Sequence, residues 1–106
     1  MERQYKRQLL VLEQQRRTIN RDTINPHISF EKIEDVDPIL TMVAEVRASY
    51  IKALFDLANG RDGIPTAAQV EQLRDLRRSY TELVEASNAL ETAIERGYIT
   101  LVGDAD

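Results

Sequence analysis

The side chains best suited to acid–base or metal chemistry in this chain are one histidine, His27, and a set of carboxylates, because cysteine is absent. A catalytic histidine needs a nucleophile or an acid beside it, and a metal site needs further ligands. His27 follows a proline and has no second histidine or cysteine to join it. We therefore interpret His27 as a structural residue.

The carboxylates are numerous, but their spacing does not form a recognisable site. Glu31, Glu34, Asp35 and Asp37 precede a predicted helix, where acidic groups favour the positive end of the helix dipole. Residues 59–63 lack the alternating ligands of a calcium loop, and no phosphate-binding glycine loop, zinc-protease motif or nucleophile elbow is present. We therefore predict no catalytic residue, no metal site and no cofactor.

Charge is distributed unevenly along the chain. The formal net charge is −4, yet residues 1–22 carry +3 and the remainder carries −7. The basic residues that we group as the basic stripe are Arg3, Lys6, Arg7, Arg17 and Arg21. They could contact nucleic-acid phosphates, or they could neutralise acidic helices or an acidic protein partner. The pI near 5.0 and the lack of a helix-turn-helix pattern favour protein over nucleic acid.

Apolar periodicity predicts a first helix over residues 2–20. Tyr5, Leu9, Leu12, Arg16 and Ile19 recur at spacings of four and three residues and share one face. Asn25-Pro26 cannot continue a helix, because the residue before proline is pushed out of the α region.

A second helix is predicted over residues 38–58. Asp37 is a good N-cap, Pro38 suits the first helical position, and Asn59-Gly60 marks the end. Apolar residues cover more than half of its circumference, so we expect it to be the central and most buried helix.

A long third helix is predicted over residues 66–96. Thr66 and Gln69 form a capping box, and Gly97 ends the helix. A heptad seam follows, typical of a coiled coil, made by Leu73, Leu76, Tyr80, Leu83, Ser87, Leu90 and Ile94. On the outer face we expect the ion pairs Glu71–Arg74, Asp75–Arg78 and Arg78–Glu82.

Three connecting segments complete the prediction. Residues 23–37 are too apolar for a flexible linker, and we interpret them as a strap across the helices. Residues 59–65 form a turn, and residues 97–106 form a short extended tail. The predicted fold is therefore all-α, with residues 1–106 in a single domain. It is a three-helix bundle, or antiparallel helical hairpin, with a coiled-coil-like third helix.

The relative lengths of the last two helices locate a candidate interface. The third spans about 46 Å and the second about 31 Å at the usual rise per residue. The end of the third helix must therefore be covered either by the strap, through Ile28, Phe30 and Ile33, or by a second chain. Both remain open. The predicted partner or dimer interface comprises Leu83, Ser87, Leu90, Ala93, Ile94, Tyr98, Ile99 and Leu101.

These observations favour a cytoplasmic, non-enzymatic protein–protein interaction module. It would act as a regulator, adaptor, inhibitor or assembly component, with a protein partner, a second copy of itself, or both. No apolar run approaches a membrane span, and the first residues lack a secretory apolar block. The alternatives are a nucleic-acid-binding protein that uses the basic first helix, and then a small all-α enzyme.

Overall fold

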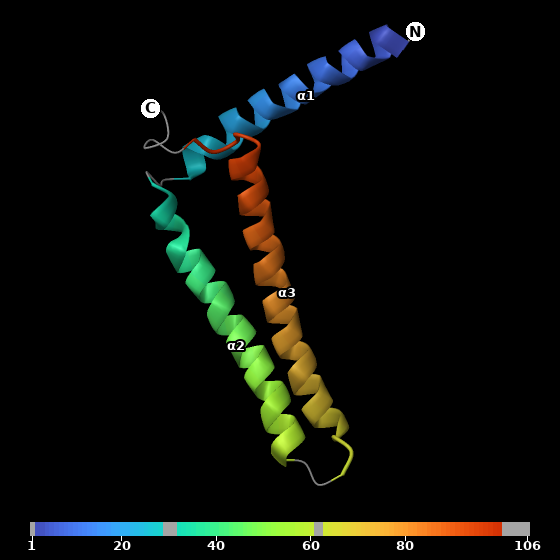
Figure 1. Ribbon diagram of the computed structural model, residues 1–106, viewed down its shortest axis with the longest axis vertical. Helices are drawn as coiled ribbons and strands as arrows, with labels where there is room; N and C mark the ends of the chain where they lie inside the picture. The colour runs from blue at the N-terminus through green and yellow to red at the C-terminus, as the bar shows by residue number, and fades with distance from the viewer. Residues whose placement is uncertain (1, 29–31, 61–62, 101–106) are drawn as a thin grey trace. The chain divides into compact units, whose positions relative to one another are not determined.

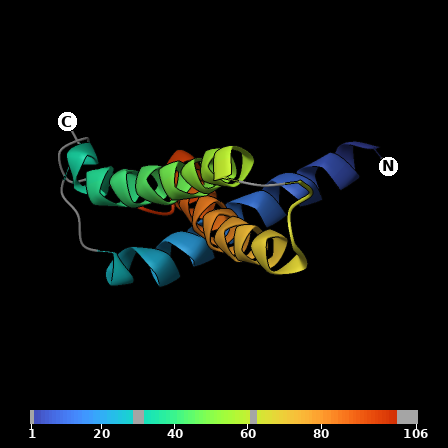
Figure 2. The same ribbon diagram turned by 90° about the horizontal axis from the view of Figure 1, so that it is seen from below.

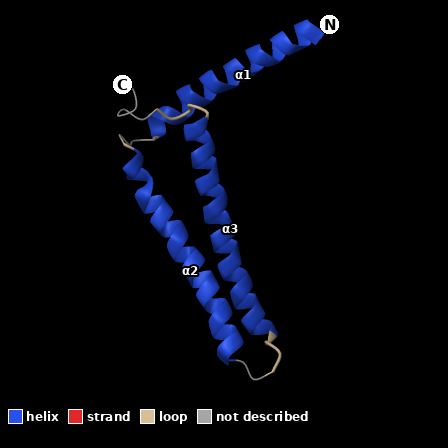
Figure 3. Cartoon of the chain, in the orientation of Figure 1, coloured by secondary structure: helices blue, strands red, loops and turns tan. Residues whose placement is uncertain are grey.

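The chain folds into helices and short turns. The computed structural model describes residues 2–28, 32–60 and 63–100, and within them it contains no strand (Figure 3). The elements are α1 (Glu2–Ile24), η1 (Asn25–His27), η2 (Ile33–Val36), α2 (Asp37–Gly60) and α3 (Ala67–Glu95). The predicted all-α class with three helices is confirmed.

The first helix is longer than its apolar pattern indicated. We predicted an end at Asn20, but α1 continues to Ile24. Proline restricts only the residue before it, so Pro26 constrains Asn25 and leaves residues 21–24 free to remain helical. The proline instead occupies an early position of the 3₁₀ turn η1, where its missing N–H costs nothing.

The second helix begins directly after a 3₁₀ turn. Its bounds, Asp37–Gly60, are one residue earlier and two residues later than the predicted 38–58. Gly60 does not adopt a positive φ, so it continues the helix instead of turning out of it. The positive φ of 103° falls at Gly63, where the chain turns towards the third helix.

The third helix has the ends that its sequence predicted, and Thr66 and Arg96 flank it at Ala67–Glu95. The Gln69 side chain accepts a hydrogen bond from the Thr66 N–H at 2.8 Å, and the Thr66 hydroxyl accepts one from the Gln69 N–H at 3.2 Å. This reciprocal pair is the predicted capping box. At the other end Gly97 has a φ of 76°, which glycine adopts without strain.

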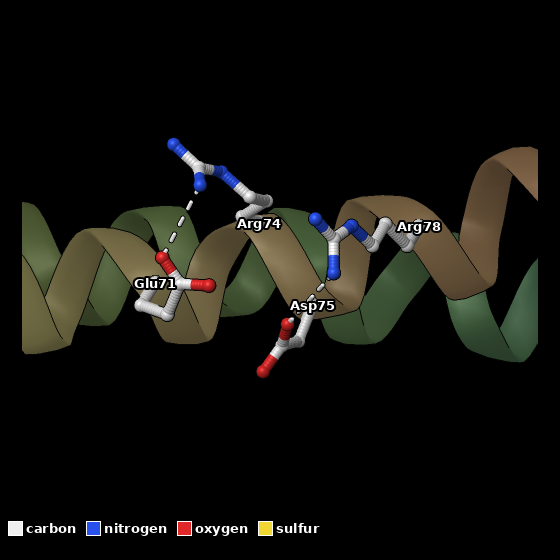
Figure 4. Close-up of polar contacts among 4 residues, drawn as sticks. All are labelled: Glu71, Arg74, Asp75 and Arg78. Atoms are coloured by element: carbon white, nitrogen blue, oxygen red, sulfur yellow. Dashed lines mark hydrogen bonds and ion pairs between the residues drawn. The ribbon is translucent and has the colours of Figure 1, made fainter.

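The ion pairs on the outer face of α3 follow the sequence spacing in part. Arg74 contacts Glu71 at 3.3 Å, and Arg78 contacts Asp75 at 3.9 Å (Figure 4). The expected Arg78–Glu82 pair is absent from the described residues, because Arg78 turns towards Asp75. All four side chains are more than half exposed, so each pair contributes only a few tenths of a kcal/mol.

Residues 36–89 form one of two compact units, and residues 1–35 with 90–106 form the other. In the first unit, α2 and the beginning of α3 run antiparallel and side by side (Figures 1 and 2). The α2 side chains that are buried or half-buried are Ile39, Val43, Val46, Tyr50, Ala53 and Leu57. Their spacing of three and four residues marks the face that packs on α3.

The second helix is no more buried than the third, contrary to the prediction, because each has one buried residue, Val43 in α2 and Ala93 in α3. Leu40, Ile51, Leu54 and Phe55 of α2 are all exposed. Apolar residues surround most of this helix, and within residues 36–89 the one neighbouring helix covers only one side of it. A second apolar side of α2 therefore remains exposed within this unit.

The other unit has a small core at the end of α3. Ala93, Tyr98 and Ile99 are buried together, and the half-buried residues Ile24, Leu90 and Ile94 pack against them. These three and Val43 are the only buried side chains among the described residues.

The predicted strap, residues 23–37, is described in part. Residues 23–24 complete α1, η1 and η2 follow, and Ile28 and Ile33 are exposed. Phe30 lies outside the described residues. Among the described strap residues, Ile24 packs at the end of α3.

No described helix combines the length and the apolar character that crossing a bilayer requires.

Candidate functional site

One face of α1 carries a row of large apolar side chains that are exposed. The row consists of Tyr5, Leu9, Leu12 and Ile19, at spacings of four, three and seven residues, and we call it the α1 apolar row. Arg16 lies on the same face between Leu12 and Ile19. All four apolar side chains are exposed, Tyr5 by 64% and Ile19 by 63%, and α1 has no buried residue. An amphipathic helix normally buries such a face against a core, and the described residues of its own unit, 1–35 with 90–106, do not bury this one.

The basic stripe lies on the opposite side of the same helix. At 100° per residue, Arg3, Lys6, Arg7, Arg17 and Arg21 fall on the face away from the α1 apolar row. All five are exposed, and within the described part of the chain none of them forms an ion pair. Arg16, on the side of the α1 apolar row, does pair, with Glu13 at 3.0 Å. The stripe is therefore an exposed positive surface within its own unit.

The predicted partner interface at the end of α3 is largely covered by the chain itself. Ala93, Tyr98 and Ile99 are buried, and Leu83, Ser87, Leu90 and Ile94 are half-buried. Leu101 lies outside the described residues. Part of this cover comes from Ile24 and from the turn after α3.

The turn after α3 has the hydrogen bonds of a Schellman motif. The Tyr98 N–H donates to the Ala93 carbonyl at 2.8 Å, and the Gly97 N–H donates to the Ile94 carbonyl at 3.1 Å. This geometry returns the chain towards the helix and places the Tyr98 ring on Ala93. The sequence predicted an extended tail here, because Tyr98 and Ile99 have high β propensity.

The hydroxyl of Tyr98 has an unusual electrostatic setting. Hydrogen bonds from the side chains of Arg96 and then Asn20 favour the ionised phenol and lower the pKa of Tyr98 below its ordinary value. The same contact raises the pKa of Arg96. A tyrosine in such a setting can be a catalytic acid, but its ring is buried and serves here to hold the turn on α3.

A cluster between α2 and α3 was not predicted from the sequence. The Nε of Arg47 donates to the Tyr80 hydroxyl at 3.1 Å, and its guanidinium lies 5.4 Å from the Tyr80 ring centre. The rings of Tyr50 and Tyr80 are 5.8 Å apart. The sequence did contain one signal for this cluster: Arg47 and Tyr50 lie three residues apart on one helix face, so both side chains can contact the same residue of a neighbouring helix. The cluster joins the two helices and holds no acid–base pair.

A shallow groove lies between α2 and α3 near the turn that joins them. It encloses about 560 Å³ and is lined by Ala53, Asp56, Leu57, Gln69, Gln72, Leu73, Asp75 and Leu76. Both of its carboxylates are already paired, Asp56 with Lys52 at 2.7 Å and Asp75 with Arg78. The groove therefore presents no free charge to a ligand.

The groups that could hold a metal do not come together in the structure. His27 lies exposed at the end of η1. Across residues 2–28, 32–60 and 63–100, no three histidine or carboxylate side chains gather as ligands would. The surfaces on which a function can be argued are thus the exposed helix faces.

Comparison of the chain with known protein families, curated proteins and solved structures finds no match. The argument for function consequently rests on the helix surfaces.

Proposed function

We propose that this protein is a non-enzymatic protein–protein interaction module, in which α1 lays its apolar row into an apolar groove of a protein partner. The main support for this proposal is that no residue of α1 is buried, although Tyr5, Leu9, Leu12 and Ile19 lie on one face of the helix. Helix-in-groove recognition uses anchors at this kind of spacing. A regulator, adaptor, inhibitor or assembly component would work in this way.

The energetics favour a covered state for this helix. Transfer of a large apolar side chain from water to a packed environment contributes about 1.5–3 kcal/mol when burial is complete. The four residues of the α1 apolar row are about half exposed or more, so docking has substantial apolar surface left to bury.

The test compares two double variants of the full chain. Leu9→Gln/Leu12→Gln replaces the two central side chains of the α1 apolar row by glutamine, which has a similar helix propensity. Arg7→Gln/Arg17→Gln removes two positive charges from the opposite face. We expect wild type and the arginine variant to retain a stoichiometric protein partner from native lysate. The leucine variant should lose it, and titration calorimetry with the purified partner should show the same order. Equal binding by all three proteins would contradict the proposal.

The basic stripe supports a second candidate function, nucleic-acid binding. Its five cations are exposed and form no ion pair in the described part of the chain. Phosphate contacts release counterions, so binding through the stripe would fall steeply with salt. Fluorescence anisotropy with duplex DNA decides between the candidates. Binding that survives physiological salt and disappears in Arg7→Gln/Arg17→Gln would favour this second function.

A further inference from the structure

The outer side of α2 carries a second heptad row, distinct from the face that packs on α3. The inward row runs through Val43, Val46, Tyr50, Ala53 and Leu57. The outer row, which we call the α2 outer row, runs through Ala44, Ala48, Ile51, Phe55 and Ala58 at spacings of four and three. All five of its residues are exposed, Phe55 by 63%. A helix with two such rows is built to pack on two helices, and within residues 36–89 only one of them is present.

The α2 outer row is complementary to itself in one orientation. When two copies of the row run antiparallel, Ala44 of each faces Phe55 of the other, and Ala48 faces Ile51. A small residue then meets a large one in each of these layers, which is how interiors reach close packing. In a parallel pair each residue would face its own copy, so alanine layers would leave gaps and the Phe55 layer would be crowded.

Charge on one flank of the row supports the same orientation. Glu45 and Lys52 are exposed, lie seven residues apart, and border the α2 outer row on the same side. The antiparallel register that aligns Ala48 with Ile51 brings Glu45 of each copy within reach of Lys52 of the other. Glu45 forms no ion pair with the described residues of its own chain, whereas Lys52 already contacts Asp56 at 2.7 Å. Two symmetric pairs of opposite charge would therefore form across a two-fold axis.

We propose that α2 pairs antiparallel with α2 of a second copy of this chain, through the α2 outer row, so that two α2–α3 hairpins form a four-helix homodimer. The partner is a second copy of this chain, because the row is complementary to itself both in the order of small and large side chains and in the order of charges. A helix of another protein would have to match both orders independently. This face differs from the α1 apolar row, so the dimer and the proposed function can fail separately.

The oligomeric state gives the first measurement. Light scattering after gel filtration of the full chain at tens of micromolar should give a mass close to twice 12.1 kDa. A mass near that of one chain would overturn the homodimer and leave the proposed function standing. A dimer that persists in Ile51→Gln/Phe55→Gln but disappears in Leu9→Gln/Leu12→Gln would place the interface on α1 and would also overturn the proposal.

A charge exchange tests the register without removing apolar side chains. Glu45→Lys and Lys52→Glu should each weaken dimerisation about ten-fold, because each turns both Glu45–Lys52 contacts into like-charge contacts. An equimolar mixture of the two variants should form a heterodimer with affinity restored, since every contact again joins opposite charges. Glu82→Lys, the same charge change on the outer face of α3, serves as the matched control and should leave the dimer intact. No recovery in the mixture would reject this register.

Cross-linking tests the orientation directly, because a chain without cysteine offers no other thiol. A disulfide requires Cα atoms within about 7 Å, so Ala44→Cys mixed with Phe55→Cys should cross-link when oxidised, and neither variant alone should. Rapid cross-linking of Ala44→Cys alone would indicate a parallel pair and would overturn the proposal. Circular dichroism of each variant establishes that its helices are retained.

Discussion

The backbone N–H of Thr100 donates a hydrogen bond to the side-chain oxygen of Asn25 at 3.1 Å, although the two residues are 75 positions apart. Asn25 follows the last residue of α1, and Thr100 follows the turn after α3. Beside them Ile24 packs against the core of Ala93, Tyr98 and Ile99. The end of α1 and the turn after α3 are therefore held together by this hydrogen bond, by the hydrogen bond from Asn20 to Tyr98 and by one small apolar cluster.

Replacement of Asn25 by alanine should weaken this connection. A hydrogen bond of this kind contributes about 0.5–1.5 kcal/mol, so we expect Asn25→Ala to lower the free energy of unfolding by about that amount. The Thr100 amide should also exchange faster with deuterium in the variant. Asn88→Ala, at an exposed position inside α3, is the control: it should leave the Thr100 exchange rate unchanged and should not lower the free energy of unfolding, because alanine is the better helix former. An unchanged exchange rate at Thr100 would show that the contact does not hold the turn.

Truncation of Ile99 should be far more damaging than truncation of an exposed isoleucine. Ile99 is 5% exposed in a core of very few side chains, and Ile→Ala substitutions in cores cost about 2–5 kcal/mol. Ile64 is 91% exposed, so Ile64→Ala should have almost no effect. Urea denaturation of both variants against wild type makes the comparison. Similar midpoints for the two would mean that the cluster around Ile99 contributes little to stability.

Two glycines at helix ends should respond to alanine in opposite directions. Gly97 has a φ of 76°, and Gly60 has no positive φ. A Cβ added at either position meets no atom within 4 Å, so the backbone alone decides the outcome. Gly97→Ala should destabilise the protein by about 1 kcal/mol, because alanine strains this conformation. Gly60→Ala should stabilise it by about 0.5–1 kcal/mol, because alanine is the better helix former. Thermal denaturation of both variants measures the two signs, and a loss in each case would contradict the assignment of Gly60 to α2.

Local signals in the sequence determined the ends of α3 and its outer-face ion pairs. The Thr66–Gln69 capping box, the Gly97 end and the Glu71–Arg74 pair depend on residues three or four positions apart, so spacing alone predicts them. The continuation of α1 to Ile24 was missed because residues 21–24 carry no clear apolar period. The return of Tyr98 towards Ala93 was missed because β propensity says nothing about a turn imposed by a left-handed glycine.

The candidate surfaces were less predictable for a different reason. Periodicity identifies which residues of a helix are apolar, but it does not identify what covers them. The α1 apolar row follows the period of a buried helix face, and apolar residues cover more than half of α2, yet the α1 apolar row and the α2 outer row are both exposed. The end of α3 read as an open seam, and the chain covers it with Ile24 and Ile99.

The pKa of Tyr98 gives a prediction in alkaline solution. Hydrogen bonds from Arg96 and Asn20 lower the pKa of this hydroxyl from about 10, so the folded protein releases the Tyr98 proton at a lower pH than the unfolded chain does. Between the two pKa values the unfolded chain binds more protons, and stability from this group therefore rises with pH. The contribution is fully present above the unfolded pKa and is lost as the pH falls through the folded pKa.

Ultraviolet titration of the phenolate band should show one of the four tyrosines ionising earlier than the others. Arg96→Gln should move that transition back towards pH 10, because the guanidinium is the largest cause of the shift. Tyr98→Phe should abolish it. Across the same pH interval, the difference in unfolding free energy between wild type and Tyr98→Phe should increase in favour of wild type. A difference that stays constant with pH would show that Arg96 does not stabilise the phenolate in the folded protein.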